Sequence, residues 1–98
     1  MDRSFSSAGN IVIYSTGWSS DCRRVKMFMD ELNVVYQEIN IDEDEDAAQE
    51  VEGINAGARS VPTIVFSDNS TLTEPSREEL ISKLVDLGLI EDTSEGKS

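Results

Sequence analysis

The 98-residue chain contains no histidine and one cysteine, Cys22. The absence of histidine removes the commonest general base, the usual Ser-His and Cys-His catalytic pairs, and most zinc sites. A single cysteine cannot close a disulfide within the chain, which excludes a disulfide-stapled secreted scaffold and a self-contained dithiol redox couple. Any disulfide must therefore involve a second molecule.

Positive charge and long apolar runs are also scarce. Eight Lys and Arg residues stand against twenty Asp and Glu, and the resulting net charge of -12 repels nucleic-acid phosphate and anionic lipid. No apolar run approaches the roughly 20 residues of a transmembrane helix, and residues 1–10 lack the apolar stretch of a secretory signal. We therefore expect a cytoplasmic monomer with neither a nucleic-acid nor a membrane partner.

The length and composition fit one globular domain, because the chain is long enough for one hydrophobic core and contains only 2 Pro and 6 Gly. We place this domain at residues 10–88. A flexible N-terminal segment, residues 1–9, is expected before it, and a flexible acidic C-terminal tail, residues 89–98, after it.

Periodicity and turn signals predict an α/β domain with the element order β-α-β-α-β-β-α. Ser19, Ser20 and Asp21 are candidate N-caps for the first helix, and Ser76 and Glu79 form a capping-box pattern before the last. A parallel crossover followed by an antiparallel hairpin predicts a mixed sheet packed against helices. The expected strands cover residues 11–14, 34–41, 61–66 and 71–73, and the expected helices cover residues 20–33, 45–54 and 77–88.

Four segments share the order and spacing of a known family. The first segment contains Thr16-Gly17-Trp18 and the expected helix start from Ser19 to Lys26. The other three segments are residues 39–42, 59–63 and 71–76. Over residues 10–88 the chain resembles the glutaredoxin branch of the thioredoxin family, and in particular the mycoredoxin-like bacterial glutaredoxins. The resemblance implies a thioredoxin-like fold with a four-stranded mixed sheet flanked by three helices, a cis Val61–Pro62 bond, and thiol–disulfide exchange.

One position departs from that family. The attacking cysteine of glutaredoxins is the first of a Trp-Cys-x-x-Cys motif, and Ser19 stands there, while Cys22 occupies the second, resolving position. A serine hydroxyl cannot form a mixed disulfide, and no histidine is present to activate it. The resemblance therefore implies an oxidoreductase framework that acts on mixed disulfides of proteins or low-molecular-weight thiols. Ser19 and Cys22 occupy its catalytic positions, and with serine at position 19 we expect the activity to be absent or impaired.

Two other functions remain open at this point. The chain is alternatively a non-redox module whose groove between Ser19 and Pro62 holds a thiol peptide or a partner segment. A weaker option is that Ser19 hydrogen-bonds a bound thiolate, since the order Ser19-Ser20-x-Cys22 resembles the Ser-Ser-Cys turn of zeta-class glutathione transferases.

Cys22 and Ser19 each have two interpretations. Cys22 lies on an apolar helical stripe with Val25, which indicates a small buried hydrophobe that reacts slowly with thiol reagents. The first turn of a helix, with Arg23 and Arg24 adjacent, instead favours a thiolate. Ser19 is either a helix N-cap or a group that acts on a substrate.

Basic residues cluster around the same region. Four of the eight, Arg23, Arg24, Lys26 and Arg59, lie at the helix start or just before Val61–Pro62, and in so acidic a chain this clustering favours an anionic ligand. Solvated charges on the helix face are an equal alternative. The resemblance implies no tightly bound cofactor, with glutathione, mycothiol or a thiol-containing protein as co-substrate. It places the Val61 backbone and Pro62 against a thiol tripeptide, Arg59 on its carboxylate, and Thr73 beside its glutamyl end. Residues 73–76 lack the family's Asp pair, so the thiol stays open.

Two further features have a structural interpretation. Trp18 is a platform for a partner or, as we favour, a loop aromatic packed over the helix. The acidic run at residues 42–46 does not fit an EF-hand, because a loop begun at Asp42 needs Gly where Ala47 stands and Glu where Gly53 stands. We expect an acidic helix N-terminus there and no metal site.

Overall fold

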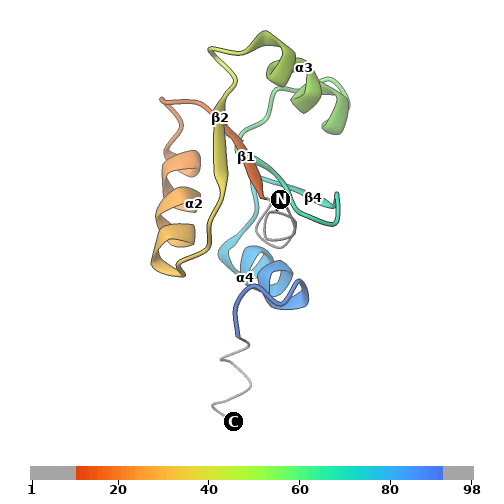
Figure 1. The fold of residues 1–98 in the computed structure, drawn as a ribbon. Coiled ribbons are helices and arrows are strands. Elements are labelled where there is room, and N and C mark those ends of the chain that lie inside the picture. Colours follow the sequence, from red (N-terminus) through yellow and green to blue (C-terminus); the bar gives the residue numbers. More distant parts are fainter. Residues whose placement is uncertain (1–10, 92–98) are drawn as a thin grey trace, which may run out of the picture.

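The computed structural model describes residues 11–91, which form a four-stranded mixed sheet with three helices (Figure 1). The predicted order β-α-β-α-β-β-α is confirmed. The predicted N-terminal segment, residues 1–9, and residues 92–98 of the predicted tail lie outside the described residues. The strands are β1 (Val12–Ser15), β2 (Gln37–Asn40), β3 (Thr63–Val65) and β4 (Thr71–Thr73), and the helices are α2 (Ser20–Glu31), α3 (Glu45–Ile54) and α4 (Arg77–Asp86).

The strands lie in the order β2-β1-β3-β4. β1 pairs in parallel with β2, so that Ser15 lies opposite Asn40, and antiparallel with β3, so that Tyr14 lies opposite Thr63. β4 continues the sheet antiparallel to β3 and places Thr73 opposite Thr63. The carboxyl ends of β1, β2 and β4 and the amino end of β3 therefore lie at one end of the sheet.

Alternation along β1 divides the core into two clusters, because successive strand side chains point to opposite faces. Ile11 and Ile13 pack with α2 and α4, and Val12 and Tyr14 pack with α3. In Figure 1, α3 lies across the sheet from α2. The first cluster contains Ile11, Ile13, Val25, Met29, Val34, Ile64, Phe66, Leu80 and Leu84, and the second contains Tyr14, Cys22, Ile41, Ala47, Ala48, Val51 and Val61.

The helix ends follow the local signals of the sequence. α3 has the predicted bounds, with Asp44 as its N-cap, and α4 begins with the predicted capping box between Ser76 and Glu79. Beyond α4, Leu89 and Ile90 pack against the first cluster, so the folded chain continues past the predicted boundary at residue 88. No helix within residues 11–91 combines the length and apolar character needed to cross a membrane.

The second strand is shorter than predicted. The strand begins at Gln37, whereas the β-branched pair Val34-Val35 predicts a start at residue 34. Asn33 takes a left-handed conformation with φ 59, and the Val34 N–H then donates a 3.0 Å hydrogen bond to the Met29 carbonyl. This backbone pattern closes α2 and keeps residues 34–36 in the connection.

Candidate functional site

The four segments that resemble the family's motif meet at the end of the sheet. The Trp18 indole N–H donates to Asp42 Oδ2 at 3.1 Å, which joins the loops after β1 and β2. The Glu74 N–H donates to the Pro62 carbonyl at 2.8 Å, which joins the end of β4 to the loop before β3. The Val61–Pro62 peptide bond is cis.

The structure brings most of the predicted site residues to this end of the molecule. Cys22 packs in one core cluster with Val61, although Cys22 belongs to α2 and the rest of that cluster lies on the α3 face. Thr73 ends β4 opposite Thr63, one residue beyond Pro62. Ser19 directly precedes α2, so Ser19, Cys22, Val61, Pro62 and Thr73 share this end of the sheet.

Ser19 is the N-cap of α2. Its backbone is extended, with φ -87 and ψ 122, and its Oγ accepts a 3.3 Å hydrogen bond from the Cys22 N–H. That contact satisfies one of the free N–H groups in the first helical turn. The N-cap interpretation of Ser19 is therefore confirmed, and its hydroxyl lies at the amino end of α2.

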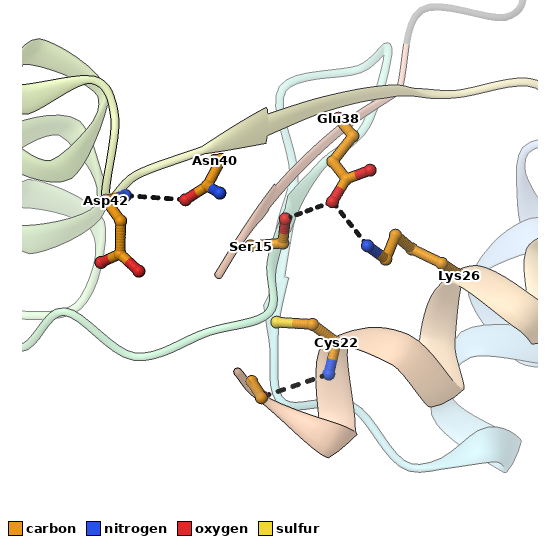
Figure 2. A network of polar contacts seen from close by, with 7 residues as sticks. Ser15, Cys22, Lys26, Glu38, Asn40 and Asp42 are labelled. Carbon is orange, nitrogen blue, oxygen red and sulfur yellow. Dashed lines mark hydrogen bonds and ion pairs between the residues drawn. The ribbon is translucent and has the colours of Figure 1, made fainter. Parts of the chain in front are cut away.

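Cys22 is buried, as its place on the apolar stripe predicts. Its exposed fraction is 0%, and Figure 2 shows its side chain pointing from α2 toward the sheet. Thiol–disulfide exchange requires direct approach of a thiolate to a disulfide sulfur. The one thiol of this chain is therefore covered, and the more accessible position beside it carries a hydroxyl.

Beside Cys22, a three-residue network connects α2 to the sheet (Figure 2). Glu38 Oε2 accepts hydrogen bonds from Lys26 Nζ at 2.6 Å and from Ser15 Oγ at 2.7 Å. The Lys26 ammonium, followed by the Ser15 hydroxyl, holds the pKa of Glu38 below its usual value of 4.5. The positive charge of Lys26 is therefore already paired with a residue of β2.

Two of the other three clustered basic residues also have acidic partners. Arg59 pairs with Glu52 and, at 2.9 Å, with Glu45; the hydrogen bonds to these carboxylates raise its pKa. Arg24 pairs with Asp21 at 3.0 Å. No described residue forms an ion pair with Arg23. Arg59 thus lies against α3, and a ligand carboxylate must compete with two glutamates for it.

The Thr73 hydroxyl has an internal role that the local sequence does not indicate. It donates to Asn55 Oδ1 at 2.6 Å, and the Asn55 amide donates to Thr63 Oγ1 at 3.0 Å and to the Val51 carbonyl at 3.1 Å. Asn55 thus connects the end of α3 to β3 and β4 beside Pro62. Asparagine after the last helical residue is a visible C-cap signal, but nothing in the local sequence indicates these partners on other strands.

Trp18 differs from expectation. The predicted packing over the helix is wrong: the side chain is 72% exposed. Its N–H bonds Asp42, which directs the ring toward the loop after β2 rather than over α2. An exposed aromatic ring therefore lies directly before Ser19 in the loop after β1.

The acidic run after β2 has the predicted structural role. Asp44 caps α3 by accepting from the Ala47 N–H at 3.1 Å, and Glu45 and Asp46 lie in the first turn, where negative charge opposes the helix dipole. Within residues 11–91, no group of three or more His, Cys, Asp or Glu side chains is arranged to hold a metal ion.

With this geometry established, comparison with known proteins assigns the family. A family model described as Glutaredoxin matches residues 11–70. A Mycobacterium tuberculosis protein named as a glutaredoxin is 41% identical over 75 residues, covering 76% of this chain and 89% of that protein. Mycoredoxin 1 of Corynebacterium glutamicum is 37% identical over 75 residues, which cover 76% of this chain and 92% of that protein.

The fold agrees with this assignment. The crystal structure of a buckwheat glutaredoxin–glutathione complex superposes with a TM-score of 0.60 and 28% identity, covering 82% of this chain and 80% of that chain. Sequence and architecture lead to the same result: the chain belongs to the glutaredoxin family and has its thioredoxin-like fold.

Proposed function

We propose that this chain is a glutaredoxin-like thiol–disulfide oxidoreductase framework whose exchange step is absent or impaired because Ser19 replaces the attacking cysteine. One observation carries the proposal. Position 19 presents its side chain to the amino end of α2, while the chain's one thiol, Cys22, is 0% exposed in the core. The framework that positions a nucleophile is therefore present, and the sulfur atom is missing from the place where it would act.

The proposed substrates are mixed disulfides of proteins or of a low-molecular-weight thiol, glutathione or mycothiol, with no tightly bound cofactor. A related glutaredoxin was solved with glutathione, and another relative is named as a mycoredoxin. We assign Val61 and Pro62 to the ligand's backbone and Arg59 to its carboxylate, after release from its glutamate partners. Thr73 contributes through its backbone, since Asn55 holds its hydroxyl. Such a protein is expected to be a cytoplasmic monomer.

A Ser19→Cys variant restores the missing chemistry in this proposal. The new thiolate at position 19 accepts the N–H of residue 22, and the helix N-terminus stabilises its charge. It attacks one sulfur of a mixed disulfide, so that a new S–S bond forms to residue 19, the substrate S–S bond breaks, and the other half leaves as a thiolate. A glutathione thiolate then attacks the substrate-derived sulfur of the enzyme-bound disulfide, so that an S–S bond forms between glutathione and that sulfur, the S–S bond to residue 19 breaks, and residue 19 leaves as the thiolate.

The test compares variants in a coupled assay on hydroxyethyl disulfide with glutathione as the reductant. Ser19→Cys should reduce the disulfide at neutral pH, while the present sequence should show almost no activity. Ser20→Cys is a matched control, because it adds a thiol one residue further on, at an exposed position outside the N-cap. Equal activity of the Ser19 protein and the Ser19→Cys variant would show that Cys22 carries the chemistry.

A second candidate is a non-redox module that holds a thiol peptide or partner segment at the same place. The burial of Cys22 beneath a hydroxyl at position 19 favours it, because a bound thiol then meets no reactive sulfur. S-methylglutathione, which cannot exchange, provides the test by calorimetry. Binding of this ligand by both proteins, together with an inactive Ser19→Cys variant, would favour the module over the oxidoreductase framework.

A further inference from the structure

A groove of about 430 Å³ lies between α2 and α4. It begins at Ser20, next to the candidate site, and follows α2 toward Glu31, with Pro75 and Arg77 on its other side. Since α2 and α4 cover the face of the sheet opposite α3, the groove opens away from the acidic run and from Arg59. Ser20 at one end of the groove directly follows Ser19, and none of the residues assigned to the thiol ligand, Arg59, Val61, Pro62 and Thr73, lines it.

The floor of the groove is apolar. Among the apolar side chains that line it, Leu80 is buried, Phe28 is half-buried, and Met27 is 58% exposed. Methionine adapts its shape to different apolar partners, and exposed apolar surface bordered by polar groups marks interaction sites. The groove therefore offers a contact for at least one apolar side chain of a ligand.

The rim of the groove is positive on a strongly acidic protein. Three arginines, Arg23, Arg24 and Arg77, line it against a single glutamate, Glu31, whereas the whole chain carries a net charge of -12. Arg24 pairs with Asp21, and the Arg77 guanidinium stacks 4.9 Å from the centre of the Phe28 ring. Charge complementarity on such a surface selects carboxylates and repels other cations.

We propose that this groove docks an acidic segment of a partner protein, with an apolar side chain against Phe28 and Met27 and carboxylates on Arg23 and Arg77. Guanidinium groups suit this role because they bind carboxylates in a bidentate geometry. The identification of the partner as a thiol protein rests on the proposed function, since the segment would flank the sulfur presented to position 19. The docking itself depends only on the groove.

The test uses a fluorescein-labelled peptide, Asp-Leu-Glu-Phe-Glu-Leu-Asp, and a matched peptide with Asn and Gln in place of the acidic residues. The expected result is binding of the acidic peptide alone, weakened about tenfold or more by the double variant Arg23→Gln, Arg77→Gln and by raised salt. Lys83→Gln is the matched control. It removes one positive charge from α4, as Arg77→Gln does, but Lys83 pairs with Asp68 and does not line the groove, so peptide affinity should not change.

Each failure has a distinct signature. Equal affinity for the two peptides, or no loss in the double variant, overturns the docking proposal. So does tighter peptide binding after removal of residues 92–98, because the chain's own acidic end would then be the occupant. Sedimentation showing a dimer that the double variant abolishes assigns the groove to a second copy and likewise overturns the proposal.

The proposed function is tested by a separate measurement. In the Ser19→Cys background, hydroxyethyl disulfide is too small to extend along the groove, so Arg77→Gln alone should leave its reduction unchanged while weakening peptide binding. Loss of peptide binding with that activity retained supports the docking role. An inactive Ser19→Cys variant that still binds the acidic peptide refutes the oxidoreductase framework and leaves the groove's specificity supported.

Discussion

Replacement of Asn55 by alanine tests whether the tertiary connection beside Pro62 holds the site together. The side chain makes three hydrogen bonds, with Val51, Thr63 and Thr73, and so ties the end of α3 to two strands. Asn55→Ala removes all three without adding bulk. The change should therefore destabilise the fold and loosen the segment that precedes β3.

The expected cost follows from what each partner retains. A typical hydrogen bond contributes about 1 kcal/mol, which gives about 3 kcal/mol for three. Two partners keep another contact: the Val51 carbonyl still accepts from the Asn55 backbone N–H, and the buried Thr63 hydroxyl still donates to the Ser60 carbonyl. We therefore expect a loss of about 2 kcal/mol in the free energy of unfolding, or about 8–16 °C in Tm for a domain of this size.

Urea denaturation followed by circular dichroism measures this loss, since the chain's one tryptophan is mostly exposed. Gln49→Ala, an exposed position on α3, is the control and should stay within about 0.5 kcal/mol. Thr73→Val removes one of the three bonds, and a double-mutant cycle with Asn55→Ala should show coupling. A cost for Asn55→Ala no larger than that of Gln49→Ala would refute the inference that Asn55 joins these elements.

Three other outcomes follow from burial and charge. Cys22 should react with a thiol reagent at least about a hundredfold more slowly in the native protein than in the denatured chain, because it is buried; similar stopped-flow rates would contradict its burial. Burial, followed by the hydrogen bond to Glu50, raises the pKa of Tyr14 to about 12 from 10.0, so its contribution to stability is complete below about pH 10 and is lost as the pH rises through 12. Tyr14→Phe should reduce the pH dependence of the unfolding free energy between about pH 10 and pH 12. An unchanged dependence in that interval would contradict the raised pKa of Tyr14. The pKa of Glu38 is lowered, chiefly by Lys26, so its contribution is present above about pH 4.5 and is lost in acid. Glu38→Gln should cost about 0.5 kcal/mol at pH 7 and less at pH 3, measured by urea titration, whereas equal costs would show that the ion pair contributes nothing.

The helix boundaries show what local chemistry decides. Ser76 and Glu79 satisfy each other's backbone N–H groups, and Ser19 and Asp44 accept from the first turns that they cap. These contacts span three residues, so local sequence patterns predict the Ser76–Glu79 capping box and include Ser19 among three N-cap candidates. The second strand shows the limit, because the closure of α2 at Asn33 overrides the β-propensity of Val34 and Val35.

The candidate site divides in the same way. The linear chain was sufficient to identify the family, the hydroxyl at position 19 and the burial of Cys22, since motif order and a helical stripe can be read along the sequence. Tertiary packing was needed to establish that Asn55 holds Thr73, that Arg59 turns to α3, that Trp18 stays exposed, and that three arginines border one groove. Each of these depends on which side chains from distant segments lie within hydrogen-bonding or packing distance. That proximity is set by how the helices pack on the two faces of the sheet.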